Sequence, residues 1–327
     1  MTAMPTLPRR ALTTGGLALS LALAKTAAAA PPPLDFPASS DSVAGPDTRN
    51  EGALAAPAPP PPLVAPPQAP RVARAAPPEP WYRLRAVAEL GFVSVLYHHL
   101  QFGRAGANFD ARSEGAEDNL YAFSRFSVEA ALFRRHQVVF LYQPLDIATR
   151  DTLRRDVRVD SLVFPSGTAL DFRYGFPFYR GSYAYDLVGR PGRELSVGLS
   201  LQIRDATVEY ASADGKLLHS SRNVGPVPLL RSRGRYAFAG GAFIGYEIDG
   251  IYYPIGSAGR SLQASLVDLS LRAGVALPLH AEAFLNLRYL GGGVTSDGPP
   301  KPPDNDGYTS DWLHTITLSI GASLSSF

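Results

Sequence analysis

Apolar and polar residues alternate one by one through most of residues 81–327. In Leu195–Arg204 the odd positions are apolar, and the even ones are Ser, Gly, Gln or Arg. A helix would repeat its apolar residues every three or four positions, whereas a period of two predicts strands with one apolar and one polar face. We expect ten strands, over the ranges 82–102, 119–133, 137–148, 168–187, 194–211, 217–231, 235–248, 262–276, 280–292 and 308–326.

The length of these segments separates two architectures. A soluble β-sandwich turns its apolar faces inward, whereas a transmembrane barrel turns them to lipid and keeps a polar lumen. Soluble strands usually have about 5–6 residues and tilted membrane strands about 9–11, and many segments here run to twelve or more. We therefore predict an all-β, antiparallel transmembrane β-barrel of about ten strands. Eight or twelve strands remain alternatives, because 157–164 could also pair and Pro226 and Pro228 interrupt the sixth segment.

The connections between the segments alternate between short and long. The short turns are predicted at 134–136, 189–192, 232–234 and around Pro278. The long connections are 103–118, 149–167 and 294–307. Transmembrane barrels have this rhythm, with short turns on the periplasmic side and long loops outside. In the fourth segment the apolar phase flips at 175–177, which predicts a bulge.

The chain before residue 81 has a different composition. Residues 1–30 have a short positive start, an apolar run and small residues near 27–30, which predicts a cleaved signal peptide. Residues 31–80 hold 16 of the 30 prolines and one aromatic residue, Phe36, so we expect a disordered periplasmic linker. Contact of this linker with the cell wall through Arg71 and Arg74 is a further hypothesis. Residues 81–327 form the predicted barrel.

Composition excludes several kinds of chemistry. The absence of cysteine excludes thiol nucleophiles, disulfides and Cys-ligated metals. Removing Arg9, Arg10 and Lys25 with the signal leaves 28 basic against 29 acidic residues, which gives no electrostatic footprint for nucleic acid. Adjacent His98 and His99 point to opposite faces of a strand. We therefore predict no metal and no cofactor.

The leader, the long alternating strands, the rhythm of turns and loops and the terminal Phe327 resemble small bacterial outer-membrane β-barrels. The resemblance covers residues 81–327. It implies an outer-membrane location, lipid and lipopolysaccharide as surroundings, and recognition of the terminal aromatic by the barrel-insertion machinery. One departure is that Phe327 is odd, whereas the apolar residues of the last strand, such as Ile316 and Leu318, are even.

The parity of the strands assigns charged side chains to the lumen. The lumen candidates are Arg125, Glu129, Asp171, Arg173, Arg204, Glu247, Asp268, Arg272, Glu282 and Arg288. Both signs occur in similar number, and buried charges need partners. Small barrels are filled by side chains, whereas sixteen or more strands leave an aqueous channel. We therefore expect a plugged lumen and a structural or surface-interaction role, with a narrow channel as the alternative.

Two other functions are alternatives. A lipid-modifying outer-membrane enzyme would need a His–Ser pair, and His219 with Ser220, Ser221 and Asn223 is the nearest approach to one, in a segment interrupted by proline. The remaining histidines, His98 among them, lie near strand ends, where an exposed ring is expected. A soluble periplasmic β-barrel that binds a ligand is the other alternative. The sequence predicts no catalytic residue.

Overall fold

The computed structural model describes residues 80–327, except 258–259, 301–305 and 327. Residues 1–79, with the predicted signal and linker, lie outside the described part. The described residues form fifteen strands: β1 (Tyr82–Phe102), β2 (Phe109–Asp110), β3 (Leu120–Leu132), β4 (His136–Gln143), β5 (Asp146–Thr152), β6 (Val157–Val159), β7 (Leu162–Phe164), β8 (Ala169–Gly175), β9 (Phe178–Asp186), β10 (Arg193–Ser212), β11 (Leu218–Ala237), β12 (Ala242–Ser257), β13 (Arg260–Leu277), β14 (Ala281–Asp297) and β15 (Tyr308–Ser325). Among the described residues, no helix is long and apolar enough to cross a membrane.

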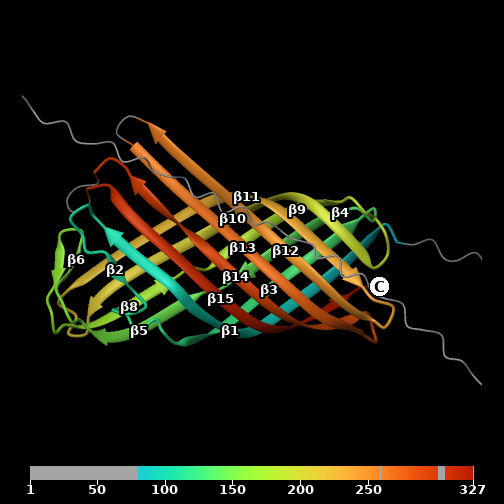
Figure 1. The fold of residues 1–327 in the computed structure, drawn as a ribbon, viewed down its shortest axis with the longest axis horizontal. Coiled ribbons are helices and arrows are strands. Elements are labelled where there is room, and N and C mark those ends of the chain that lie inside the picture. The colour runs from blue at the N-terminus through green and yellow to red at the C-terminus, as the bar shows by residue number, and fades with distance from the viewer. Residues whose placement is uncertain (1–79, 258–259, 301–305, 327) are drawn as a thin grey trace, which may run out of the picture. The chain divides into compact units, whose positions relative to one another are not determined.

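Ten of these strands close into an antiparallel ring, as Figure 1 shows. Around the ring their order is β1, β3, β4, β9, β10, β11, β12, β13, β14 and β15, and β15 pairs with β1. One end of the ring, here called the turn end, carries the short turns and the C-terminal residues. The other, here called the loop end, carries β2 and β5–β8. The predicted ten-stranded antiparallel β-barrel is confirmed.

The bounds of β1, β3, β10 and β13 follow the prediction closely, whereas the predicted strands 137–148 and 168–187 are each divided in two and 235–248 is displaced to Ala242–Ser257. The displacement comes from one wrong turn. The predicted turn at 232–234 lies inside β11, which continues to Ala237 and pairs with both of its neighbours. Gly234 is there for a packing reason. A Cβ on Gly234 would lie 2.2 Å from the ring of Tyr246 on β12, so the glycine makes room for that ring. The real turn follows at 238–241, between Ala237 and Ala242.

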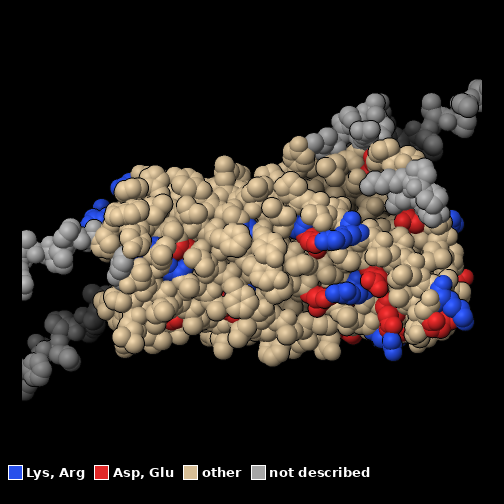
Figure 2. All heavy atoms as spheres, turned by 180° about the vertical axis from the view of Figure 1, so that it is seen from behind, with Lys and Arg blue, Asp and Glu red and all other residues tan. Residues whose placement is uncertain are grey.

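The outer surface of the barrel is apolar. On β10 the Leu199 side chain is 63% exposed and the neighbouring Ser200 only 4%. The same alternation leaves large apolar side chains exposed on every strand of the ring, for example Phe92 on β1 and Ile320 on β15. Figure 2 shows a broad band with few charged residues, and most of the charges gather toward the loop end. This is the inverse of a soluble protein, and it is the surface that lipid requires.

The direction of the side chains inverts toward the loop end. Pro144–Leu145 separates β4 from β5, and Phe176–Pro177 separates β8 from β9. Beyond these breaks the apolar Phe172 and Tyr174 are buried inside, whereas Arg173 is exposed and Asp171 is half-buried. The predicted phase flip at 175–177 therefore falls where β8 ends. It marks the transition from a wall that faces lipid to a wall that faces water.

The inward apolar side chains of the loop end form a core, here called the cap. It holds Phe102, Phe109, Phe164, Phe172 and Tyr210, with smaller apolar residues packed around them. The Phe109 ring centroid lies 5.2 Å from that of Tyr210 and 5.3 Å from that of Phe172. Phe109 belongs to β2, in the segment 103–118 that was predicted as an external loop. That segment packs against the wall of the barrel.

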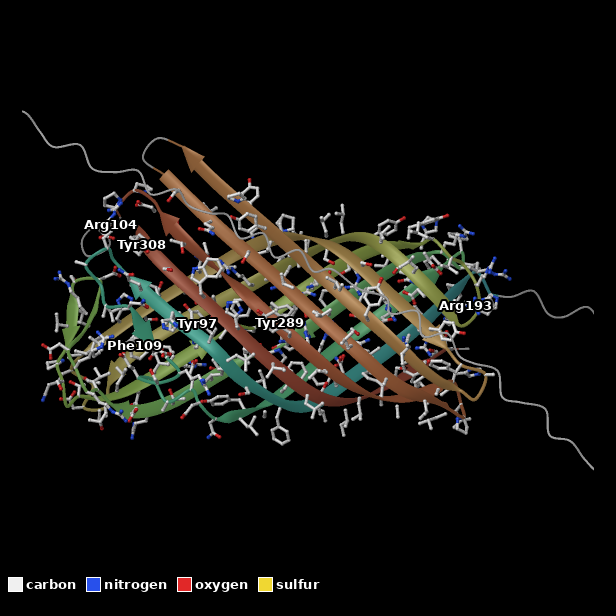
Figure 3. The ribbon with its side chains drawn as sticks, in the orientation of Figure 1. Tyr97, Arg104, Phe109, Arg193, Tyr289 and Tyr308 are labelled. Carbon is white, nitrogen blue, oxygen red and sulfur yellow. The ribbon has the colours of Figure 1, made fainter. Side chains whose placement is uncertain are left out.

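Aromatic side chains gather in two bands on the outer surface. At the turn end Trp81 stacks on Phe133, and the Arg193 guanidinium lies 5.1 Å from the ring of Tyr236. Toward the loop end Tyr97 stacks on His99 at 4.2 Å. Nearby, the Tyr289 hydroxyl and the His314 Nδ1 lie 2.5 Å apart. Figure 3 labels Arg193, Tyr97 and Tyr289 along the barrel. Aromatic bands at both interfaces are typical of membrane barrels.

Candidate functional site: the lumen

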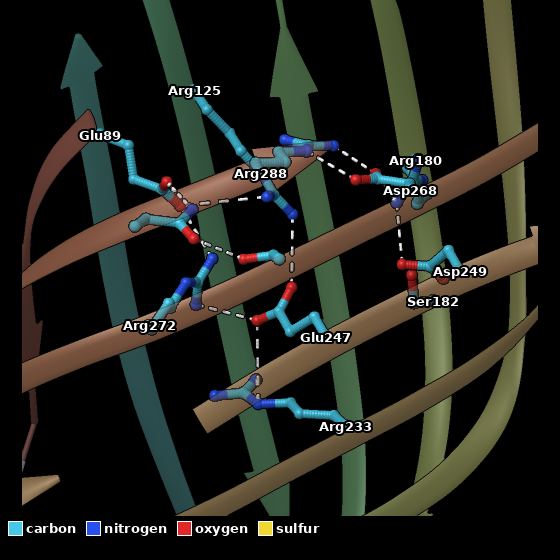
Figure 4. A network of polar contacts seen from close by, with 12 residues as sticks. Glu89, Arg125, Arg180, Ser182, Arg233, Glu247, Asp249, Asp268, Arg272 and Arg288 are labelled. Atoms are coloured by element: carbon cyan, nitrogen blue, oxygen red, sulfur yellow. Dashed lines mark hydrogen bonds and ion pairs between the residues drawn. The ribbon is translucent and has the colours of Figure 1, made fainter. Parts of the chain in front are cut away.

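Charged side chains from opposite walls meet inside the barrel, in a group here called the ionic layer (Figure 4). Glu247 on β12 lies at its centre. Its Oε1 is 2.9 Å from the Arg272 Nη1, and its Oε2 is 3.4 Å from the Arg125 Nη2 and 3.5 Å from the Arg231 Nη2. The Arg233 Nε lies 3.9 Å from the same Oε1. A carboxylate that is almost fully buried thus has four guanidinium partners from three strands.

A second node of the layer is built around Arg180 on β9. Its Nη1 lies 2.8 Å from the Asp249 Oδ2 and 2.7 Å from the Asp268 Oδ2. Its Nε donates to the Gln202 Oε1 at 3.1 Å. Asp268 also accepts from the Arg288 Nε at 2.6 Å. Arg180 is fully buried, so each donor needs such a partner.

The third node joins the first and the last strand of the ring. Glu89 on β1 accepts from the Arg272 Nη2 at 2.8 Å and from the Asn286 Nδ2 at 2.6 Å. Ser319 on β15 donates to the same carboxylate at 3.2 Å. Burial of an unpaired charge would cost several kcal/mol, so hydrogen bonds from three strands are the physical condition for Glu89 to lie there.

The charges of the lumen nearly cancel. Eight arginines face seven carboxylates across the network, which leaves a formal charge of +1. They are Arg85, Arg125, Arg180, Arg231, Arg233, Arg235, Arg272 and Arg288, against Glu89, Glu129, Glu194, Glu247, Glu282, Asp249 and Asp268. A lumen of this composition attracts neither cations nor anions strongly, and its side chains are committed to one another.

Eight of the ten lumen candidates lie on the inner side of the wall. Seven join the network, namely Arg125, Glu129, Glu247, Asp268, Arg272, Glu282 and Arg288. Arg204 lines a small cavity at the loop-end side of the layer. Asp171 and Arg173 lie outside instead, where Asp171 pairs with Arg150 and Arg173 with Asp146. Their strand, β8, belongs to the part of the barrel where polar side chains face water.

The sequence prediction missed several members of the ionic layer. Glu89 has the inward parity of β1 and could have been found from that pattern alone. Arg180 was missed because the break before β9 resets the phase, and Asp249 because the predicted strand ended at 248. Arg233 was missed because the predicted turn at 232–234 took it out of the strand. Arg231 was the last residue of the predicted strand 217–231 and was not assigned to the lumen. The omissions of Arg180, Asp249 and Arg233 follow from an error in a strand boundary or phase.

Buried polar residues also lie between the cap and the ionic layer. The His98 Nδ1 is 2.6 Å from the Glu117 Oε2, and both side chains are fully buried. The His98 Nε2 lies 3.6 Å from the Asp311 Oδ1, and Asp311 accepts from the Tyr174 hydroxyl at 3.4 Å. The expectation of an exposed ring is therefore wrong for His98. The side chain instead ties the segment 103–118 to β1 and β15.

No family model matches this chain, and no curated protein matches it. Among solved structures it is similar to the outer-membrane protease OmpT from Escherichia coli, with 11% identity, 74% of this chain and 96% of that chain covered, and a TM-score of 0.44. It is also similar to the β-domain of the Bordetella autotransporter BrkA, with 16% identity, 75% and 98% covered, and a TM-score of 0.32. The closed ring itself confirms the resemblance to the bacterial outer-membrane barrel class at the level of fold.

The nearest approach to an enzymatic His–Ser pair has another arrangement. The His219 Nε2 faces Asp160 at 3.8 Å, and the ring packs beside Phe102 of the cap. Among the described residues no hydrogen bond joins His219 to Ser220 or Ser221. Within the same part of the chain, no group of three or more His, Asp or Glu side chains could hold a metal ion.

A carboxylate connects two segments at the loop end. Asp306 accepts from the Arg104 backbone N–H at 2.7 Å and from the Tyr308 N–H at 3.0 Å. These two backbone donors, first that of Tyr308 and then that of Arg104, lower the pKa of Asp306 below its usual range. The segment 103–118 is therefore held at one side by Glu117 and at the other by Asp306.

Proposed function

We propose that this protein is an integral outer-membrane β-barrel whose lumen is plugged by its own side chains, with a structural or surface-interaction role exercised at the loop end. The observation that carries the proposal is the ionic layer. It fills the lumen with paired side chains, several of them fully buried, such as Arg180 and Arg288. The cap then fills the loop end with apolar side chains.

The orientation follows from the general rule for such barrels. Short turns face the periplasm and long connections face the outside, so the loop end is the external end. Its arginines are paired with aspartates, as in Arg150–Asp171, Arg173–Asp146 and Arg222–Asp205. A surface with both signs paired in this way suits contact with polar, weakly charged partners better than with a strongly charged one. Lipid and lipopolysaccharide surround the apolar band.

Conductance in planar bilayers tests the plug. The folded protein is first verified by its mobility on SDS gels, unboiled against boiled, and a sixteen-stranded porin reconstituted in the same way serves as the positive control. We expect no current steps of porin size from this protein. Current steps of that size would contradict the plugged lumen and indicate an open channel. A protein without a heat-dependent shift that stays in the soluble fraction would contradict the membrane location itself.

A further inference from the structure

The wall of the barrel is unpaired along one line, here called the seam. β11 pairs with β10 from Leu218 to Tyr236, but with β12 only between Leu230↔Gly250 and Ala237↔Phe243. Beyond Gly250, β12 pairs only with β13. The seam thus consists of the β11 edge at 218–229 and the β12 edge at 251–257. In Figure 1 the β12–β13 hairpin projects beyond the neighbouring strands.

Prolines explain why the seam does not close. Pro226 and Pro228 lie in an uninterrupted ladder with β10, and Pro254 lies in one with β13. Proline fits a strand only where its nitrogen points away from the paired neighbour. All three nitrogens therefore face the seam, where they offer no donor. If the register of Leu230↔Gly250 were continued, Pro226 would lie opposite Pro254. The same lack of donors protects both edges from pairing with another chain.

A cavity lies behind the seam. It is lined by Arg204 of β10 and by Ser265 and Leu266 of β13, together with side chains of β8, β14 and β15. Arg204 is the ladder partner of Gly225, and Leu266 is that of Ile251, so these residues lie beside the seam. None of the described residues of β11 or β12 lines the cavity. The lining is therefore incomplete on the side of β11 and β12.

The outer face of the seam's rim carries large apolar side chains beside the Arg222–Asp205 pair. Val224 on β11 is 58% exposed and Tyr252 on β12 is 62% exposed. Asn223 and Tyr253 have the inward parity of their strands, and both are nevertheless exposed. Neither residue has a ladder partner on the strand across the seam. The path from the surrounding lipid into the cavity is thus open at the level of the backbone.

The cavity combines apolar walls with one uncommitted cation. Phe176, Leu266 and Leu313 supply the apolar surface. Arg204 forms no ion pair with any described residue, and its Nε has no hydrogen-bond partner there. The other charged group, Asp311, faces His98 at 3.6 Å and accepts from Tyr174. An unpaired guanidinium binds carboxylates and phosphates, which it can hold through two parallel hydrogen bonds.

We propose that the seam is a lateral portal through which a single-chain amphiphile with an anionic head group moves from the surrounding lipid to Arg204. The head group pairs with the guanidinium, and the chain lies between the apolar walls and the lipid. Both a fatty acid and a lysophospholipid have this chemistry. The inference rests on the outer-membrane location proposed above, and that location is tested separately by fractionation and by the heat-dependent gel shift.

Photolabelling of the folded, reconstituted protein tests the head-group contact. The probes are a diazirine fatty acid, its methyl ester and a diazirine lysophosphatidic acid, and labelled peptides are mapped by mass spectrometry. We expect the acid to label the edges of the seam about tenfold more than the ester, as the loss of one charge-assisted hydrogen bond implies. In Arg204→Gln the label from the acid falls to the level of the ester. Equal labelling by acid and ester in the unchanged protein would overturn the proposal, and the third probe distinguishes a carboxylate from a phosphate head.

Closure of the seam tests the portal. The triple variant Pro226→Val, Pro228→Thr and Pro254→Thr restores the three donors, and slowed exchange of these amides shows that the ladder has extended. If exchange stays fast, an oxidised Val227→Cys/Tyr253→Cys variant closes the seam in a chain without other cysteines. We expect labelling to fall about tenfold on closure and to be unchanged in Pro278→Ala, a control at the turn end. Unchanged labelling in a closed barrel that still shows the heat-dependent gel shift would contradict the portal.

Discussion

The His98 imidazole and the Glu117 carboxylate lie 2.6 Å apart, and neither is accessible to solvent. The pair joins β1 to a segment that sequence analysis treats as an external loop. An external loop held by a buried, charge-assisted hydrogen bond is part of the folded wall. This pair therefore holds the segment 103–118 in place, and the packing of Phe109 in the cap does so as well.

Replacement of Glu117 by Ala is expected to release this segment. Breaking a buried charged pair costs roughly 3–5 kcal/mol, because the remaining partner stays buried. We expect trypsin to cleave the folded protein at Arg104 or Arg112 far faster than in the unchanged chain. Glu114→Ala is the matched control, since Glu114 pairs with Arg155 at the surface and such pairs contribute about 0–1 kcal/mol. Equal cleavage rates in the two variants would contradict the role given to Glu117.

Replacement of Glu247 by Gln is expected to destabilise the barrel strongly. It leaves Arg272, Arg125 and Arg231 without their shared carboxylate. We expect the free energy of unfolding from lipid vesicles, measured in urea, to fall by about 3–5 kcal/mol. Asp171→Asn removes an exposed pair instead and should cost less than about 1 kcal/mol. A loss of similar size in both variants would mean that the ionic layer does not stabilise the fold.

A side chain at Gly321 is expected to disturb the turn-end half of the lumen. A Cβ built on Gly321 lies 2.2 Å from the Phe284 ring, which also carries the Arg272 guanidinium at 5.1 Å. Gly321→Ala therefore forces the ring to move and strains a packed interior, at a cost of about 1–3 kcal/mol. The loss of stability is measured as a lower temperature at which the folded form changes its mobility on SDS gels. Gly225→Ala is the control, because no atom lies closer than 4.0 Å to the Cβ site of Gly225.

The contact between the external segments is expected to depend on pH. The pKa of Asp306 is lowered by the N–H groups of Tyr308 and Arg104, so the folded contact favours the ionised carboxylate. Its stabilisation is complete above the ordinary pKa of an aspartate and is lost as the pH falls through the lowered value. NMR shifts of the Arg104 and Tyr308 amides should report one titration in that acidic range. In Asp306→Asn both shifts should become independent of pH there.

How far the sequence predicts this molecule depends on which solvent faces each strand. Where lipid surrounds the whole wall, alternation alone places residues such as Leu199 and Ser200 correctly, and the bounds of β1 are predicted to the residue. On β8 the same rule places Asp171 and Arg173 in the lumen instead of outside, because alternation does not say which face of a strand is in contact with water. The pairing of His98 with Glu117 leaves no local signal, since contact depends on how 103–118 folds back.

The order of the strands around the ring has a consequence for biogenesis. β1 and β15 are neighbours, so the wall closes only when the last strand of the chain reaches the first. Glu89 meets Arg272 and Asn286, which follow it by 183 and 197 residues. Until closure, these groups would be charged or polar and without partners next to the hydrocarbon phase. An incomplete barrel would therefore carry a cost for these unpaired groups, and they find their partners only when the ring closes. Closure of the ring and pairing of these buried groups therefore depend on each other.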